Sequence, residues 1–237
     1  MPVGASHPRK GFAADTQKQL AESDWDFRAP TWGAADLLMD HPYEFRKPDF
    51  TGEVDPAHYL RATPEDATCK GLYFHSMLDM MAKLPKDRVA DIVIERPRYL
   101  PFLDYPLREH MRLSFALVPR LFPGKPTRQA FREMGWKAFP DFSATMLGRV
   151  VFGVLGDDLQ RAFESGPRAI AQSIKPGLAV INTLGERHMR MEYYDIFGIL
   201  DPYYIGVVEG MVRHYGFEPD VRIHTMDIAN AVLDVKW

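Results

Sequence analysis

The spacing of apolar and polar positions divides the chain into two regions. Between residues 69 and 174, apolar side chains recur every three or four positions, which is typical of helices that bury one face. After Lys175 the pattern changes to alternation, which is typical of strands with one buried face. In the first region, the pattern predicts helices over residues 70–84, 85–95, 105–122, 126–156 and 157–174.

Prolines indicate where several of these helices end or break. The helix over residues 105–122 should end near Pro119 and Pro123, because proline has no amide hydrogen to donate within a helix. For the same reason, the segment 126–156 should form two helices that separate near Pro140. We expect a further break in the last helical segment, just before Pro167.

The alternating region predicts two antiparallel hairpins with one helix between them. Residues 177–185 and 187–196 form the first pair, with a turn near Gly185, and residues 220–227 and 230–237 form the second. We therefore predict an α+β fold, in which an N-terminal helical half is followed by a β-β-α-β-β antiparallel sheet unit.

The helix between the hairpins contains two glycines four residues apart, Gly206 and Gly210. A glycine inside a helix costs about 1 kcal/mol relative to alanine, so the pair indicates that another backbone or a ligand approaches closely. We favour packing against the strands or a neighbouring helix over contact with a ligand. Asp201 suits the N-cap of this helix, Pro202 its first turn, and Gly216 its C-cap.

The first 68 residues contain no long periodic segment, because prolines interrupt them at seven positions. They are nevertheless rich in aromatic side chains, unlike most disordered tails. We expect an irregular arm, with short helices over 12–22 and 33–40, that packs on the main domain of residues 69–237 or on a partner subunit. The main domain divides into a helical part and a sheet part, 69–174 and 175–237.

The composition is that of a globular protein, with 46% hydrophobic and 26% charged residues. The net charge of −3 gives no electrostatic reason to expect a nucleic acid or an anionic membrane as partner. We find no signal peptide and no apolar stretch of about 20 residues, so we expect a cytoplasmic protein without a membrane span. The single cysteine, Cys69, excludes an intramolecular disulfide, and we interpret it as a buried small residue.

Several short motifs occur in an order that resembles a known family. They are "KGLYF" at 70–74, "YP" at 105–106, "LFPG" at 121–124, "FSATMLGR" at 142–149 and "YYIGVVEG" at 203–210. Together they are similar to a family of unknown function that is expanded in myxobacteria. The order of elements also resembles the haem nitric-oxide/oxygen-binding fold and the vinyl-reductase-type small-ligand domains. The resemblance covers roughly residues 69–237.

The resemblance implies that this chain lacks the groups that anchor haem in its relatives. Those proteins bind iron through a histidine on the helix before the first hairpin, but no histidine lies between His110 and His188. They bind the propionates with a Tyr-x-Ser-x-Arg motif, and the matching stretch here has Tyr193, Asp195 and Phe197 at those three positions. An aspartate would repel the propionates, and a phenylalanine cannot replace the guanidinium. We therefore predict no haem and no other cofactor.

The histidines form no compact metal motif, although one weak grouping exists. His75 and Asp79 lie four residues apart on a predicted helix, and Glu109 and His110 lie on another helix that could approach it. An ion pair on the helix surface is the simpler explanation. We therefore predict no metal site, and we keep His75, Asp79 and His110 as weak catalytic candidates.

Methionines and aromatic residues are spread through the helical half and suit an apolar pocket between helices and sheet. Filling of the core explains any single one of them equally well. The candidate ligand-contacting residues are Phe74, Met77, Met81, Phe115, Phe139, Met146, Tyr193 and Tyr194.

Three functional hypotheses follow. The first is a non-haem sensor or adaptor that binds a small apolar molecule, with His75, His110 or the two tyrosines as orienting polar groups. The second is an enzyme, metal-dependent in one version, that uses the same cavity on a hydrophobic or aromatic substrate. The third is a dimeric scaffold with a vestigial pocket, in which Gly206, Gly210 and the aromatic arm serve association. We also expect a homodimer.

Overall fold

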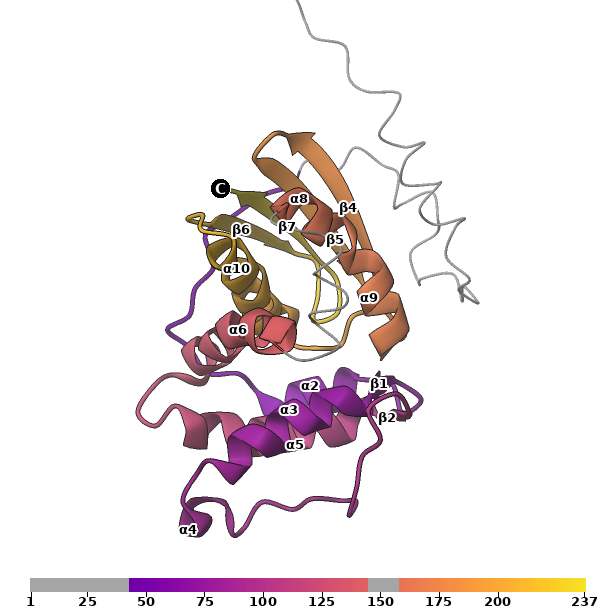
Figure 1. The fold of residues 1–237 in the computed structure, drawn as a ribbon, viewed down its shortest axis with the longest axis vertical. Coiled ribbons are helices and arrows are strands. Elements are labelled where there is room, and N and C mark those ends of the chain that lie inside the picture. Colours follow the sequence, from indigo (N-terminus) through magenta and orange to yellow (C-terminus); the bar gives the residue numbers. More distant parts are fainter. Residues whose placement is uncertain (1–42, 145–157) are drawn as a thin grey trace, which may run out of the picture.

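The computed structural model describes residues 43–144 and 158–237. In Figure 1 a helical layer occupies the lower end of the molecule, and an antiparallel sheet with its covering helices occupies the upper part. Met146 and the helices predicted over 12–22 and 33–40 lie outside the described residues. Among the described residues, no helix is both long and apolar enough to cross a bilayer.

Four helices form the lower layer. They are α2 (Pro56–Ala62), α3 (Gly71–Ala82), α4 (Lys86–Val89) and α5 (Leu107–Leu121). α5 packs on α2 and α3 through an apolar face that buries Met111, Leu117 and Val118. α4 is shorter than the helix predicted over 85–95, because the β-branched residues Val93 and Ile94 disfavour its continuation and are exposed.

A small three-stranded sheet links this layer to the rest of the molecule. Its strands are β1 (Thr68–Lys70), β2 (Asp104–Pro106) and β3 (Ile174–Lys175), in the antiparallel order β2-β1-β3. The sequence pattern did not predict this sheet, because strands of two or three residues are too short to show alternation. Cys69 lies in β1 and is buried, as expected.

The main sheet is the predicted pair of hairpins. It contains β4 (Leu178–Gly185), β5 (His188–Tyr194), β6 (Asp220–Thr225) and β7 (Ala231–Lys236), in the order β4-β5-β7-β6. All three pairings are antiparallel, and Met191 at the centre faces Ile181 on β4 and Leu233 on β7. The α+β fold with its β-β-α-β-β unit is therefore confirmed.

Two long helices, α6 (Thr127–Ala144) and α10 (Ile205–His214), pack against each other at very short range. A Cβ atom on Gly206 would overlap the main-chain carbonyl of Arg132, and one on Gly210 would lie 2.5 Å from the carbonyl oxygen of Trp136. The two glycines therefore permit close approach of a neighbouring helix, which answers why they are present. Both are buried within one chain, so their proposed role in subunit association is wrong.

The helix end expected near Pro119 and Pro123 is confirmed, since α5 ends at Leu121 with Pro119 in its last turn. The break expected near Pro140 is not observed, because Pro140 lies within α6, which continues to Ala144. A proline within a helix removes one hydrogen bond to the preceding turn, and its ring crowds a carbonyl of that turn. For α6, the contact with α10 outweighs this loss, because tertiary packing supplies most of a helix's stability. The predicted break before Pro167 is confirmed, since α8 (Leu159–Glu164) and α9 (Gly166–Ser173) are separate helices.

The start of the glycine-containing helix differs from the prediction. A wide helical turn, η2 (Leu200–Tyr204), precedes α10, and Asp201 within it has extended backbone angles of φ −112° and ψ 108°. Asp201 does not cap the helix, because its carboxylate pairs with the guanidinium of Arg128 at 2.6 Å. Gly216 has the expected positive φ, 83°, just after the end of α10.

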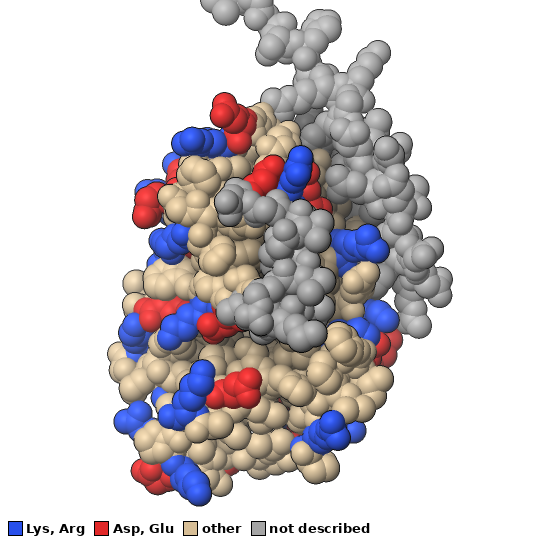
Figure 2. Space-filling view, in the orientation of Figure 1, with Lys and Arg blue, Asp and Glu red and all other residues tan. Residues whose placement is uncertain are grey.

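The described part of the N-terminal arm packs on its own chain. Arg46 and Ile223 exchange two backbone hydrogen bonds of 3.0 and 2.9 Å, which adds a short bridge to the edge strand β6. The ring of Phe50 lies 4.1 Å from the guanidinium carbon of Arg132 on α6. Figure 2 shows acidic and basic side chains interspersed over the visible face, so this face carries no stripe of a single charge.

Candidate ligand site at the junction of the helical layer and the sheet

Five rings from four elements gather where the helical layer meets the sheet. They are Tyr73 of α3, His110 of α5, Tyr193 of β5, and Tyr203 and Tyr204 of η2, and we call them the junction cluster. Ring centroids lie 6.0 Å apart for Tyr73 and His110, 5.7 Å for Tyr203 and Tyr204, and 5.5 Å for Tyr204 and Tyr193. Burial raises the pKa of Tyr203 and Tyr204, and the phenol of Tyr73 adds to both shifts, so Tyr73 lies in the same region as these two tyrosines.

Two hydroxyl groups of the junction cluster have no hydrogen-bond partner within the described ranges. The hydroxyl of Tyr73 hydrogen-bonds to Ser173 at the end of α9. Those of Tyr203 and Tyr204 have no hydrogen-bond partner among the described residues. Over residues 43–144 and 158–237, Arg190 Nε is the only fully buried side-chain nitrogen or oxygen atom that lacks a hydrogen-bond partner. Buried polar groups are normally hydrogen-bonded, so these two hydroxyls are candidates for contact with water or a ligand.

The surroundings of the junction cluster keep its polar groups neutral. Burial lowers the pKa of His110 to about 4, although one ring nitrogen donates a hydrogen bond to the carbonyl of Tyr73. Its other ring nitrogen has no partner within the described ranges. Burial raises the pKa of Tyr203, and raises that of Tyr204 well above its usual value. At neutral pH the cluster therefore offers uncharged donors and acceptors.

Of the predicted ligand-contacting residues, Phe74 lies beside this cluster and Tyr193 belongs to it, while Met77, Met81 and Phe115 pack in the core. Phe74 is buried on α3, with its ring centroid 5.1 Å from that of His110. Met77 is buried one helical turn further along α3, and Met81 and Phe115 are partly buried against the same core. Tyr193 points to the same side, since it belongs to the cluster itself.

Other predicted residues lie elsewhere. Strand alternation places Tyr194 on the opposite face of the sheet from Tyr193. There, Tyr194 donates a hydrogen bond of 2.7 Å to Glu192, which also accepts one of 3.0 Å from Asn182. Phe139 lies on α6 beside α10.

The weak catalytic candidates do not converge on one another. His75 is exposed, and its Nε2 atom donates to the carbonyl of Tyr99 at 2.5 Å; Asp79 is exposed on the same helix. Glu109 is buried and accepts hydrogen bonds from the hydroxyl of Tyr99 and, at 3.0 Å, from Arg96. His110 points away from these groups, toward Tyr73 and Phe74. Over the described ranges, no three His, Cys, Asp or Glu side chains are close enough to bind a metal.

The positions that anchor haem in the resembling proteins have different chemistry here. The helix before the first hairpin, α9, has the sequence GPRAIAQS and contains no histidine. Burial and the neighbouring Asp227 raise the pKa of Asp195, so a further anion at this position would be repelled. Phe197 offers no donor.

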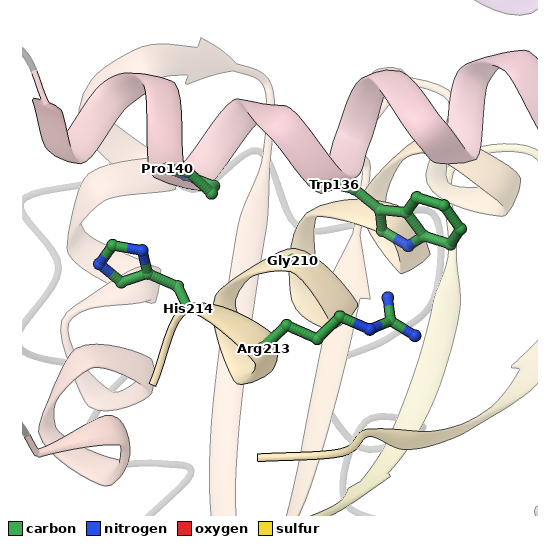
Figure 3. A pocket seen from close by; sticks show the side chains of 5 residues that line it. All are labelled: Trp136, Pro140, Gly210, Arg213 and His214. Carbon is green, nitrogen blue, oxygen red and sulfur yellow. The ribbon is translucent and has the colours of Figure 1, made fainter. Parts of the chain in front are cut away.

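An open groove lies outside the junction, between α6 and α10. Its volume is about 490 Å³, and Figure 3 shows Trp136 and Pro140 on one helix facing Gly210, Arg213 and His214 on the other. The indole NH of Trp136 donates to the buried carboxylate of Glu209 at 2.5 Å. The indole and its neighbouring carboxylate are thus engaged in packing the two helices, so the groove ranks below the junction as a ligand site.

Sequence reasoning missed Tyr73, Ser173, Tyr203 and Tyr204. Tyr203 and Tyr204 were noted only as part of the motif "YYIGVVEG". The signal that could have found them is their place directly before the glycine-containing helix, where a helix start meets the sheet. Ser173 gave no signal, because its contact with Tyr73 joins residues 100 positions apart in the chain.

Known structures share this fold. The chain resembles an Fe(II) unliganded H-NOX protein from K. algicida with a TM-score of 0.55 and 13% identity, covering 70% of this chain and 95% of that one. A variant of an H-NOX protein from S. oneidensis gives a TM-score of 0.54 and 15% identity over 70% and 95% of the two chains. A variant of the T. tengcongensis H-NOX gives 0.50 and 16% over 70% and 93%. At these identities the similarity establishes the fold alone.

The sequence comparison is more specific than the structural one. No protein with a curated description matches the chain. Residues 62–237, about three quarters of the chain, match the family described as "Protein of unknown function (DUF2378)". This range includes every motif on which the resemblance was based. The chain therefore belongs to the DUF2378 family, whose members are of unknown function, and has an H-NOX-like fold.

Proposed function

We propose that this chain is a sensor or adaptor domain that binds a small, mainly apolar molecule at the junction cluster without haem. One observation carries the proposal. The hydroxyls of Tyr203 and Tyr204 and one nitrogen of His110 have no partner among the described residues, yet they lie in surroundings that penalise charge. Polar groups in such surroundings are normally satisfied by protein, water or ligand.

The chemistry of the cluster defines the ligand class. Two neutral hydroxyls and a neutral imidazole can orient a carbonyl, hydroxyl or amide group, and Phe74 and Met77 supply apolar contacts. No cation belongs to the cluster, so an uncharged ligand fits better than a carboxylate. The ligand would signal by stabilising one arrangement of α3 and α5 relative to η2, which requires different affinity for two states.

We propose further that haem is not the ligand. One of the similar structures was determined to probe heme distortion in the H-NOX family, so the fold is compatible with that cofactor. The donor set of this chain is not, because α9 has no histidine and Asp195 would repel a propionate. Titration of the purified protein with haemin should give only the spectrum of free haemin, and a stoichiometric Soret shift would overturn this part of the proposal.

Native mass spectrometry of the freshly purified full chain tests the main proposal. We expect an additional mass of a small organic molecule, and the same spectrum tests the predicted homodimer. Tyr203→Phe removes one hydroxyl without changing the ring, and we expect it to lower ligand affinity about fivefold to tenfold, the contribution of one hydrogen bond.

Tyr194→Phe is the matched control, since it removes a hydroxyl on the opposite face of the sheet. It should retain the ligand wherever circular dichroism shows a folded protein. Equal ligand loss in both variants, or no bound molecule and no binding of an uncharged naphthalene fluorophore by the wild type, would refute a site at the junction cluster.

A further inference from the structure

The large apolar side chains that are exposed in the described part of the chain all lie in one short segment. They belong to the apolar ridge, which we define as Val93, Ile94, Leu100, Phe102 and Leu103. The two most exposed are Val93 at 77% and Phe102 at 70%. The segment forms the lower end of the molecule in Figure 1, below α3 and α5. Clustered exposed apolar residues usually mark an interaction surface.

The ridge is exposed although its backbone is firmly attached to the helical layer. Gly71 N donates to the carbonyl of Leu103 at 2.9 Å, and Leu72 N donates to that of Pro101 at 3.0 Å. The amide of Leu100 donates to the hydroxyl of Tyr105 at 2.7 Å. These hydrogen bonds hold the apolar side chains outward, where water alone would disfavour them.

Ion pairs with α5 hold residues 91–96, which include the first two residues of the ridge. Glu95 pairs with Arg112 at 2.6 Å, and Arg96 with the buried carboxylate of Glu109 at 3.0 Å. Asp91 pairs with Arg120 in the same way. The acidic side chains at 91 and 95 are therefore neutralised by bases of α5, and they add no free negative charge beside the ridge.

The charges that remain near the ridge are mostly positive. Four bases between residues 83 and 98 have no carboxylate partner in the described ranges, against one such acid, Asp87, which leaves a net charge of +3 (4 − 1). In Figure 2 the lower end of the molecule is mainly tan, with blue and some red side chains at its margins. The four bases, which we call the basic margin, are Lys83, Lys86, Arg88 and Arg98.

We propose that the apolar ridge and its basic margin dock on the surface of an anionic lipid bilayer. The outward-pointing apolar side chains would enter the acyl-chain region of such a surface, and the unpaired bases beside them would contact its anionic headgroups. A second copy of the chain fits less well, because it would bring two positive margins together. Five side chains are also few for a stable dimer, whose interface buries at least about 1,200 Å².

Co-sedimentation of the full chain with vesicles tests this inference. We expect binding to phosphatidylcholine vesicles that contain phosphatidylserine, weaker binding to phosphatidylcholine alone, and loss of binding as salt increases. Phe102→Ser should weaken binding about tenfold, because one aromatic side chain leaves the acyl region. Lys86→Gln with Arg98→Gln should weaken it about thirtyfold on anionic vesicles only.

Lys47→Gln with Lys236→Gln is the control, since it removes two exposed positive charges that lie outside residues 83–103. It should leave vesicle binding nearly unchanged. The proposal is overturned if the wild type does not bind anionic vesicles, or if both charge variants weaken binding equally. It is also overturned if Phe102→Ser instead converts a dimer into a monomer in light scattering, which would assign the ridge to a second copy of the chain.

Discussion

Replacement of Gly210 by alanine tests whether the short contact between α6 and α10 determines the stability of the upper half of the molecule. The new Cβ atom would lie 2.5 Å from the carbonyl oxygen of Trp136 and 2.8 Å from its Cα. Both are main-chain atoms of a helix, so no side-chain rotation can relieve the overlap. Ordinary contact begins near 3.4 Å, and the helices must therefore separate by about 0.9 Å (3.4 − 2.5).

The expected change in stability has two opposing parts. Alanine gains about 1 kcal/mol in helix propensity over glycine. Separation of the helices costs about 1–3 kcal/mol for overpacking. It also strains the bond between Arg132 and the buried Glu209, where both hydrogen bonds measure 2.7 Å. Complete loss of such a buried pair costs about 3–5 kcal/mol. We therefore expect Gly210→Ala to lower the free energy of unfolding by about 3 kcal/mol.

Urea unfolding followed by circular dichroism and tryptophan fluorescence measures this change. Gly166→Ala is the matched control, because Gly166 also lies in a helix and its added Cβ would meet only the Cδ1 atom of Ile181 at 3.6 Å. The control should stay within about 0.5 kcal/mol of the wild type or become slightly more stable. If Gly210→Ala is as stable as Gly166→Ala, main-chain contact does not explain the glycines.

Two further predictions follow from buried titratable groups. His110 binds its proton less readily when folded, with a pKa of about 4 against 6.5 when unfolded. The contribution of neutral His110 to stability is therefore complete above about pH 6.5 and is lost as pH falls toward 4. We expect the free energy of unfolding to fall by about 2 kcal/mol between pH 7 and 4.5. Urea unfolding at both pH values measures this loss, and His110→Gln should abolish it. Burial raises the pKa of Cys69 from 9.0 to about 12, so iodoacetamide should alkylate the folded protein about a thousandfold more slowly than the urea-unfolded one by mass spectrometry, and equal rates would show that the thiol is accessible.

The periodicity of apolar residues was sufficient to predict the strands and helices whose own sequence shows a regular pattern. The two hairpins were predicted correctly because strands of six to eight residues are long enough for alternation to show, although β5 and β7 bury both faces rather than the one face expected. The glycine pair also identified a close backbone contact, although the sequence could not say that the neighbour was α6. Pro140 misled the prediction of a helix break, because the packing that compensates for a proline is not visible in its own segment.

The junction cluster could not be predicted, because its members come together only through long-range contacts. Adjacent residues of a strand point to opposite faces of the sheet, so Tyr193 and Tyr194 lie on different faces of β5. This alternation does not say which face meets the helical layer, since both faces of β5 are buried. The pairing of Asp201 with Arg128 was likewise invisible, and it places η2 where local signals predicted an N-cap.

The glycines and the junction cluster are parts of one structural arrangement. Gly135 of α6 lies against η2, and a Cβ atom there would overlap the carbonyl of Tyr203 and lie 2.8 Å from the amide nitrogen of Val207. Because residue 135 has no side chain, α6 can contact the backbone of Tyr203, whose hydroxyl belongs to the junction cluster. The three glycines at 135, 206 and 210 set the distance between α6 and α10, and η2 is continuous with α10. Any change in that distance must move the hydroxyl of Tyr203, so the stability of the helix pair and the geometry of the proposed site are coupled.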